Sequence, residues 1–282
     1  MKHLALAAAL LGLASAAHAE TCTRAGLTRV IDDYFKVVET HQMSALPTAK
    51  NLRITENGQD MQPGDGLLKS GGKTLLRRDL IDTERCATVS EAVTEETIDG
   101  ALTQAVMAVR LKVDAGKVGE IETLVTREKE QARFYNPKAL LATADQDWTT
   151  PLPPTARKSR EYMNDVANKY FSAFSKDKVE DGPYAAVCHR WEGGLQTTAK
   201  TGKCSPQGTG LYMNHTHRRF PVTDTELGIT AGFMNFGGAL PDVHIFKFND
   251  KGEVYLINAV FGGRLQGDHA VWPDEAKPAA LK

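Results

Sequence analysis

Three segments within residues 183–261 decide the fold: Cys188-His189-Arg190-Trp191-Glu192-Gly193-Gly194, Arg218-Arg219-Phe220-Pro221-Val222-Thr223-Asp224 and Pro241-Asp242-Val243-His244-Ile245-Phe246-Lys247. They combine carboxylates, arginines and histidines with β-rich sequence. The run 243–248 alternates, which places His244 and Phe246 on one face of a predicted strand. The first half of the chain carries a weaker copy of the same organisation.

The copy is an internal repeat. An offset of 136 residues relates the following pairs: Tyr34-Phe35 with Tyr170-Phe171, Pro47 with Pro183, Glu56 with Glu192, 111–118 with 247–254, and Ala108 with His244. Asp82-Thr83-Glu84 matches Asp224-Thr225-Glu226 at a larger offset, which a short loop insertion explains. Because both ends of the repeat share one offset, the sequence indicates duplication.

Each copy has the same predicted order of elements. Apolar residues at helical spacing predict helices over 27–39 and 162–174. Strands are predicted over 105–113 and 243–248, and their hairpin partners over 118–125 and 254–261, with turn residues between them. A proline-rich connector separates the copies. We expect a first domain at 20–147, a linker at 148–156 and a second domain at 157–282.

The N-terminus has the pattern of a signal peptide. A short basic region precedes an apolar run that ends at Ala17-His18-Ala19, so we expect residues 1–19 to be removed on export. No later segment is long and apolar enough to span a bilayer. The formal net charge is −1 with both signs interspersed, which argues against a nucleic-acid partner. We expect a soluble secreted or periplasmic protein that does not bind membranes.

Export makes disulfides possible for the four cysteines, Cys22, Cys86, Cys188 and Cys204. Four cysteines allow three pairings. We favour one bridge in each half, Cys22–Cys86 and Cys188–Cys204. Metal ligation by these thiols is the weaker interpretation, because no C-x-x-C pair is present.

A helix followed by a curved antiparallel sheet, repeated once, resembles the nuclear-transport-factor-like, or SnoaL-like, superfamily in element order and size. The resemblance implies an α+β fold with two tandem cone-shaped barrel domains. In each, the helix packs into the open side of the sheet and leaves a pocket at one end. Superfamily members include lyases, isomerases, dehydratases, hydrolases and non-catalytic binders, so the fold leaves the function open.

Nearly the whole mature chain is also similar to a family of exported, mainly fungal proteins of unknown function. That family carries a C-x-R-x-E-G-G strand, an arginine pair before an aspartate, a P-D-S-H-x-F-R strand and a D-T-x-x-C segment. The three segments quoted above and Asp82-Thr83-Glu84-Arg85-Cys86 match these motifs. Val243 and Lys247 depart from them, as does the polarity of residues 257–260. The family implies no reaction.

The candidate catalytic residues are His244, Glu192 and Asp224. A neutral imidazole in a pocket can act as a general base or acid near neutral pH, and a carboxylate in an apolar cleft has a raised pKa. The structural alternatives are a histidine bonded to Asp242, a Glu192 paired with an arginine of the Arg218-Arg219 segment, and a scaffold pair between that segment and Asp224. Glu56 survives in the first copy, which favours the structural interpretation of Glu192.

The candidate substrate-binding residues are Arg190, Arg219, Tyr170 and Phe246. An arginine fork suits a carboxylate or phosphate, and of Arg218 and Arg219 only one can enter the pocket, because adjacent strand residues face opposite ways. His215 and His217 share a strand face, but no metal-binding signature supports them. We therefore expect neither a metal nor a cofactor.

The sequence favours a cofactor-independent lyase, isomerase or dehydratase that acts on a small organic molecule in the second-domain pocket. Such chemistry needs only a base, an acid and an apolar cavity. The alternative is a non-catalytic protein that binds a small ligand or a partner. The oligomeric state and the substrate are not determined by the sequence.

Overall fold

The computed structural model describes residues 22–131, 133–263 and 272. The predicted signal peptide, residues 1–19, and most of the chain after residue 263 lie outside the described residues. The first domain contains α2 (Arg24–Thr40), η1 (Met43–Ala45), β1 (Thr48–Glu56), β2 (Gln59–Met61), α3 (Leu67–Ser70), β3 (Gly71–Asp82), β4 (Ala87–Ile98), β5 (Ala101–Asp114) and β6 (Lys117–Thr126). The second contains α6 (Arg160–Ser172), β7 (Tyr184–Glu192), β8 (Leu195–Gln196), β9 (Thr216–Asp224), β10 (Ile229–Phe236), β11 (Leu240–Phe248) and β12 (Val254–Phe261).

The two domains have the same strand order. The first sheet runs β2-β1-β6-β5-β4-β3 and the second β8-β7-β12-β11-β10-β9, with six strands each. Most neighbours are antiparallel, but β1 pairs with β6, and β7 with β12, in parallel. The expectation of purely antiparallel sheets was therefore wrong. The strand after the helix adds to the far edge of the last hairpin and runs in the same direction as its neighbour. The sheets are open, and the fold is α+β with mostly sheet.

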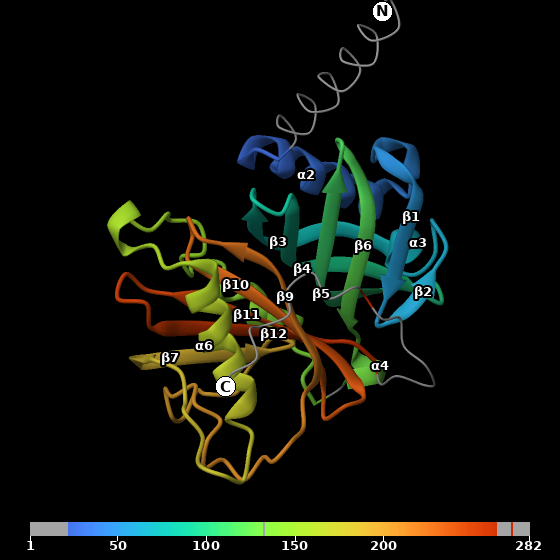
Figure 1. Cartoon of the computed structure of the whole chain (residues 1–282). Helices are drawn as coiled ribbons and strands as arrows, with labels where there is room; N and C mark the ends of the chain where they lie inside the picture. Colours follow the sequence, from blue (N-terminus) through green and yellow to red (C-terminus); the bar gives the residue numbers. More distant parts are fainter. Residues whose placement is uncertain (1–21, 132, 264–271, 273–282) are drawn as a thin grey trace, which may run out of the picture.

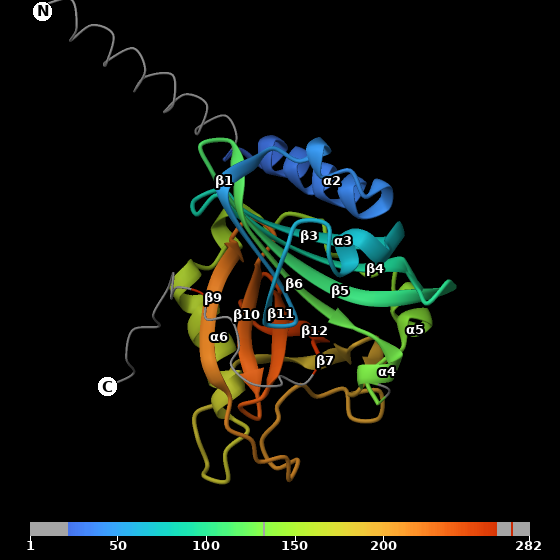
Figure 2. The ribbon, with the colours of Figure 1, turned by 90° about the vertical axis from the view of Figure 1, so that its right-hand side faces the viewer.

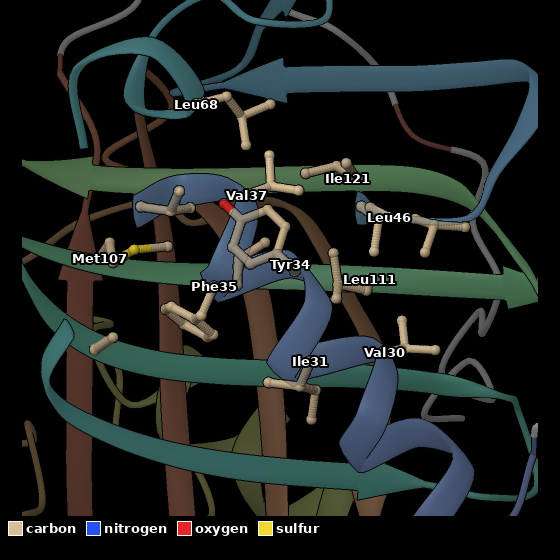
Figure 3. Packing of buried hydrophobic residues seen from close by; sticks show 14 of the residues in the cluster. Val30, Ile31, Tyr34, Phe35, Val37, Leu46, Leu68, Met107, Leu111 and Ile121 are labelled. Carbon is tan, nitrogen blue, oxygen red and sulfur yellow. The ribbon is translucent and has the colours of Figure 1, made fainter. Parts of the chain in front are cut away.

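The predicted helices are confirmed. Thr23 caps α2 by accepting a hydrogen bond from the Gly26 backbone, and Ser159 caps α6 by accepting one from Tyr162. The apolar stripe of α2 is buried against the first sheet, as Figure 3 shows around Tyr34 and Phe35. The apolar stripe of α6 packs in the same way on the second sheet.

The sheets pack against each other through the faces that the helices leave uncovered. One apolar cluster spans both sheets and includes Leu80, Val89, Val106, Ala108 and Leu124 from the first, and Val222, Ile229, Val243, Ile245 and Val260 from the second. The helices α2 and α6 therefore lie on the outer sides of the molecule (Figure 1, Figure 2). Strands of the second sheet run across those of the first (Figure 3). Together these contacts make a two-domain sandwich with three cores.

Two arginines cross this interface in a reciprocal arrangement. Arg160, the first residue of α6, binds Asp82 of the first domain, with 2.6 Å between Nη1 and Oδ2. Arg24, the first residue of α2, binds Asp224 of the second domain, with 2.7 Å between Nη2 and Oδ1. The same arginines also reach Glu84 and Glu226.

Backbone groups follow the same symmetry. The Thr223 N–H donates to Asp82, and the Ile81 N–H donates to Asp224. The repeated Asp-Thr-Glu segments are thus interface motifs, and the two domains meet as a pseudo-symmetric pair.

The cysteine pairing is confirmed: Cys22 bonds to Cys86 and Cys188 to Cys204. Two disulfides indicate a compartment outside the reducing cytosol. Within the described part of the chain, no helix has the length and hydrophobicity needed to cross a bilayer.

The connection between the domains runs from residue 127 to residue 159 and contains α4 (Glu128–Gln131), α5 (Pro137–Leu141) and η2 (Pro154–Ala156). It contacts the second domain well before the predicted linker at 148–156. Tyr135 forms an isolated bridge with Gly194, and the Asn136 N–H donates to the Gly193 carbonyl. An added Cβ at Gly193 would lie 2.1 Å from the Phe134 carbonyl oxygen, so this close approach requires glycine.

Candidate functional site

His244 lies in the middle of β11 on the face that meets α6. Alternation along the strand sends Val243 and Ile245 to the interdomain cluster, while Phe246 joins His244 beneath the helix. The imidazole is fully buried and packs against the rings of Tyr170 and Phe171, at centroid distances of 5.4 and 5.5 Å. The predicted face of His244 and Phe246 is confirmed.

Asp242 accompanies His244 two residues earlier on the same face. Its Oδ2 lies 3.1 Å from His244 Nδ1, and both side chains are fully buried. The contact lacks the geometry of a hydrogen bond. Among the described residues, both carboxyl oxygens of Asp242 and both ring nitrogens of His244 are without a hydrogen-bond partner. Orphaned buried polar atoms of this kind call for an explanation.

Burial decides the protonation of this pair. Desolvation lowers the pKa of His244 to about 3, against which the nearby Glu192 carboxylate acts in the opposite direction. Desolvation, reinforced by Glu192, raises the pKa of Asp242 well above its ordinary value. Burial therefore favours the uncharged form of both groups, a neutral imidazole and a protonated carboxyl group.

Three further polar side chains adjoin the pair. Arg190 of β7 donates from Nη1 to the Tyr170 hydroxyl at 2.9 Å and from Nε to the Thr197 hydroxyl at 2.9 Å. Its Nε lies 3.6 Å from Oε1 of Glu192, the last residue of the strand. Burial raises the pKa of Tyr170, which keeps its hydroxyl protonated. We call Tyr170, Arg190, Glu192, Asp242 and His244 the polar cluster.

The structure thus brings together His244, Glu192, Arg190, Tyr170 and Phe246 of the sequence-based candidates. It places Asp224 and Arg219 elsewhere. Asp224 lies in the interdomain interface with Arg24, as described above. Arg219 faces the first domain and pairs with Glu122 there. Both side chains point from β9 toward the other sheet although they lie five residues apart, because the register of β9 against β10 shifts between Arg219 and Val222.

Arg218 takes the opposite direction and reaches α6, where it donates to the Ser172 hydroxyl at 2.8 Å. The expectation that only one of the two arginines faces the helix side is confirmed, but that arginine is Arg218. His215 is buried between Phe174 and Phe236, and His217 is not. Within the described ranges, no group of three or more His, Cys, Asp or Glu side chains is arranged to hold a metal ion.

The first domain has no such cluster. The residue-by-residue match between the domains differs from the 136-residue offset in the strand that carries His244. Gly232 lies opposite His244 in the β10–β11 ladder, and Ser90 lies opposite Val109 in the β4–β5 ladder. The hairpin formed by β11 and β12 is one residue longer than the hairpin formed by β5 and β6. Residues of β11 therefore match those of β5 at an offset that is one residue shorter. The counterpart of His244 is therefore Val109, and not Ala108, which lies in the interdomain cluster.

With this register, Met107 corresponds to Asp242, and Ile54 corresponds to Arg190. All three first-domain counterparts are buried in the core under α2; Figure 3 shows Met107 there. The same three positions are apolar in one domain and ionisable in the other. Asp242 is the residue that sequence reasoning did not count as catalytic, although its spacing of two from His244 predicts a shared face.

The first domain instead has an open cleft of about 670 Å³ at the end of its sheet. Arg127 lies in it and binds Glu56 and Glu96, at 2.9 and 2.7 Å. Glu56 is the counterpart of Glu192 and also accepts a hydrogen bond from the Leu67 backbone. One guanidinium therefore pairs with two carboxylates at this end of the first domain, whereas in the described part of the chain Glu192 has only the longer contact to Arg190.

Comparison with known families finds a match in the second domain. Residues 156–261, from just before α6 to the end of β12, match the profile of a domain of unknown function (DUF8021). The second domain is similar to a family without an assigned function. A comparison with curated proteins gives no match. The matched segment contains the whole polar cluster.

Proposed function

We propose that the second domain is a cofactor-independent acid–base site for a small organic molecule, of the lyase, isomerase or dehydratase type. One observation carries the proposal: Arg190, Asp242 and His244 occupy buried positions that are apolar in the first domain. Leaving a buried polar group without a hydrogen bond costs about 1–3 kcal/mol. A duplicated scaffold that folds with apolar residues at these positions has no structural need for the polar ones.

The protonation states support an elimination that needs no cofactor. Neutral His244 takes a proton from a carbon next to a carbonyl group, and that electron pair forms the new double bond. The Asp242 carboxyl group gives its proton to the departing hydroxyl, which leaves as water. The imidazolium then returns its proton to Asp242, 3.1 Å away, and both groups regain their starting states. Arg190 is positioned to polarise the substrate oxygen, and Glu192 to stabilise the imidazolium.

We further propose that both domains are SnoaL-like cones and that residues 1–19 direct export to the periplasm or the medium. The order of elements, with the helix on the face of a curved sheet, supports the first proposal. The two disulfides support the second.

The enclosure of the site supports an alternative function. His244 is fully buried, and Phe134 from the connector stacks on Phe261 beside it, with 5.0 Å between centroids. A substrate can reach the imidazole only if these side chains move. A non-catalytic protein that holds one ligand for a long time, enclosed by the same side chains, is equally consistent with this burial.

The discriminating experiment is a screen of small hydroxy and keto acids by mass spectrometry, with the wild-type protein and Asp242→Asn and His244→Ala variants. We expect conversion by the wild type and a loss of about a hundredfold or more in both variants. The matched control is Val109→Ala, which alters the equivalent first-domain position and should leave turnover unchanged. Turnover that survives in His244→Ala would refute the acid–base role. Tight binding without turnover in the wild type would establish the alternative.

A further inference from the structure

A second site lies on the outer surface, beside the C-terminal end of α6. It is a pocket of about 500 Å³ lined by Phe171, Ser172, Phe174, Tyr212, Met213 and Arg218, among others. We call it the α6 pocket. Phe171 and His215 separate it from His244, because Phe171 contacts both imidazole rings. The α6 pocket is therefore distinct from the polar cluster and faces the solvent.

Arg218 is the one charged side chain that lines this pocket. All of its described hydrogen bonds go to neutral acceptors: the Ser172 hydroxyl, the Asn168 side chain and carbonyl, and the His215 carbonyl. In the described part of the chain no carboxylate forms an ion pair with it, in contrast to Arg24, Arg127 and Arg160. Burial lowers the pKa of Arg218 with no neighbouring acid to compensate. A half-buried guanidinium that is held in place but not neutralised is a site for an anion.

Five of the other eight lining residues are apolar or aromatic, namely Phe171, Phe174, Val179, Tyr212 and Met213, and three are polar, namely Ser172, Ser175 and Asn214. The guanidinium lies over the ring of Phe171, 5.8 Å from its centroid. Across the opening, the loop after the second disulfide exposes three large apolar side chains in a row, Leu211, Tyr212 and Met213, at 46, 52 and 39% of their surface. Lys176 lies over the Tyr212 ring and adds a second positive charge at the rim. An apolar floor with a positive anchor matches an amphipathic anion.

We propose that the α6 pocket binds an organic anion with an apolar body, such as an aromatic carboxylate, with its charged group on Arg218 and its body between Phe171, Phe174 and Tyr212. The anchor is pre-organised, since Ser172 and Asn168 already fix the guanidinium. The apolar loop residues 211–213 would be covered by the ligand. This binding does not depend on the chemistry proposed for His244.

The test compares two probes of similar shape, 1-naphthoate and the neutral 1-naphthamide, by titration calorimetry on the full-length mature protein. We expect naphthoate to bind at least about tenfold more tightly, because a carboxylate forms a charge-assisted, two-point pair with a guanidinium and a carboxamide does not. Arg218→Gln should weaken naphthoate binding by about tenfold to a hundredfold and leave naphthamide binding nearly unchanged.

Two controls define the result. Arg29→Gln removes an exposed arginine of α2 that also donates to a neutral backbone carbonyl, and it should have no effect on either probe. His244→Ala should leave naphthoate binding unchanged, which separates this inference from the proposed function. Equal affinity of the wild type for both probes, no binding of naphthoate, or preference for naphthoate in Arg218→Gln would each overturn the proposal.

Arg218 also contacts α6, so thermal melts accompany the titrations. If Arg218→Gln does not fold, Arg218→Lys and Tyr212→Ser decide the question. The lysine variant keeps the charge but loses the fork, and should bind naphthoate several-fold more weakly than the wild type. The serine variant removes an exposed ring and should weaken both probes. Unchanged affinities in both variants would overturn the proposal.

Discussion

The helix-facing side of the first sheet carries Ile54, Met107 and Val109, and the same side of the second carries Arg190, Asp242 and His244. On the opposite sides, where the sheets meet, the two domains remain alike. Both contribute apolar residues to one cluster, and both offer an aspartate to the arginine that begins the other domain's helix. Conserved features thus mark the contact between the domains, and divergent ones mark the interior of the second. Without any knowledge of a substrate, the comparison distinguishes the polar residues that both domains share from those that only the second domain has.

The largest expected effect tests the structural side of this comparison. Arg160→Ala leaves Asp82 without its guanidinium in a buried interface, where the Asp82 side chain is 1% exposed. Breaking a buried pair in this way costs about 3–5 kcal/mol. Urea unfolding of the variant should show this loss with binding properties of the folded protein unchanged. A variant as stable as the wild type would show that the reciprocal arginines do not hold the domains together.

The next effect tests the functional side. The double variant Asp242→Met/His244→Val gives the second domain the first-domain residues at two of these three positions. We expect it to be more stable by about 2–4 kcal/mol, because orphaned polar groups are replaced by the apolar side chains that the first domain has at these positions. Thermal and urea unfolding measure the gain, and the proposed turnover should vanish. Destabilisation would instead identify the pair as part of the structural framework.

The pH dependence of stability should show a smaller effect, and its direction can be predicted. Below the unfolded pKa of 6.5, the unfolded state protonates His244 while the folded state does not until about pH 3. Asp242 acts in the opposite sense, because its raised folded pKa keeps a proton that the unfolded state releases above its ordinary pKa. In the wild type the two contributions therefore oppose each other between the ordinary pKa values of the two groups. In the Asp242→Asn variant, only the contribution of His244 to the pH dependence of stability remains.

Relative to the wild type, Asp242→Asn should therefore lose roughly 1–2 kcal/mol of stability as the pH falls from 6.5 to 5. Urea unfolding at several pH values measures the slope. A variant with the same pH profile as the wild type would mean that His244 is protonated in the folded protein, contrary to its burial.

The smallest expected effect concerns Arg24, the counterpart of Arg160 in the other domain. Arg24→Ala should cost only about 1 kcal/mol, because the Arg24 side chain is 34% exposed and water can partly replace it. Asp224 and Asp82 each keep two backbone hydrogen bonds, so the expected difference rests on the exposure of Arg24 alone. The measurement is the same urea titration. Equal losses for Arg24→Ala and Arg160→Ala would show that the interface is energetically as well as geometrically symmetric.

Sequence patterns predicted much of this architecture. The helical spacing before Tyr34 and Tyr170, the two hairpins and the shared offset all correspond to elements of the structure, because they are local signals. The parallel addition of β1 and β7 was missed, since the pairing of distant strands leaves no local pattern. The extra residue in the second hairpin was also missed, and it moved the counterpart of His244 by one position.

The site was predicted in part for a similar reason. Alternation correctly placed His244 with Phe246, and it limited Arg218 and Arg219 to opposite faces. It did not say which face meets the helix and which meets the other domain. Asp224 and Arg219 therefore looked like pocket residues, although both bind the first domain. Only the packing of the two sheets distinguishes these surfaces.

The sandwich between the sheets has a consequence for synthesis. The first domain leaves the ribosome before its partner exists, with Leu80, Val89, Val106 and Leu124 on an uncovered sheet face. Such a face is an aggregation hazard until the second sheet covers it. Nascent chains that end within the connector should therefore depend on chaperones or associate with each other. The polypeptide passes through this vulnerable stage once in every round of translation. The stage ends when β9–β12 have been made.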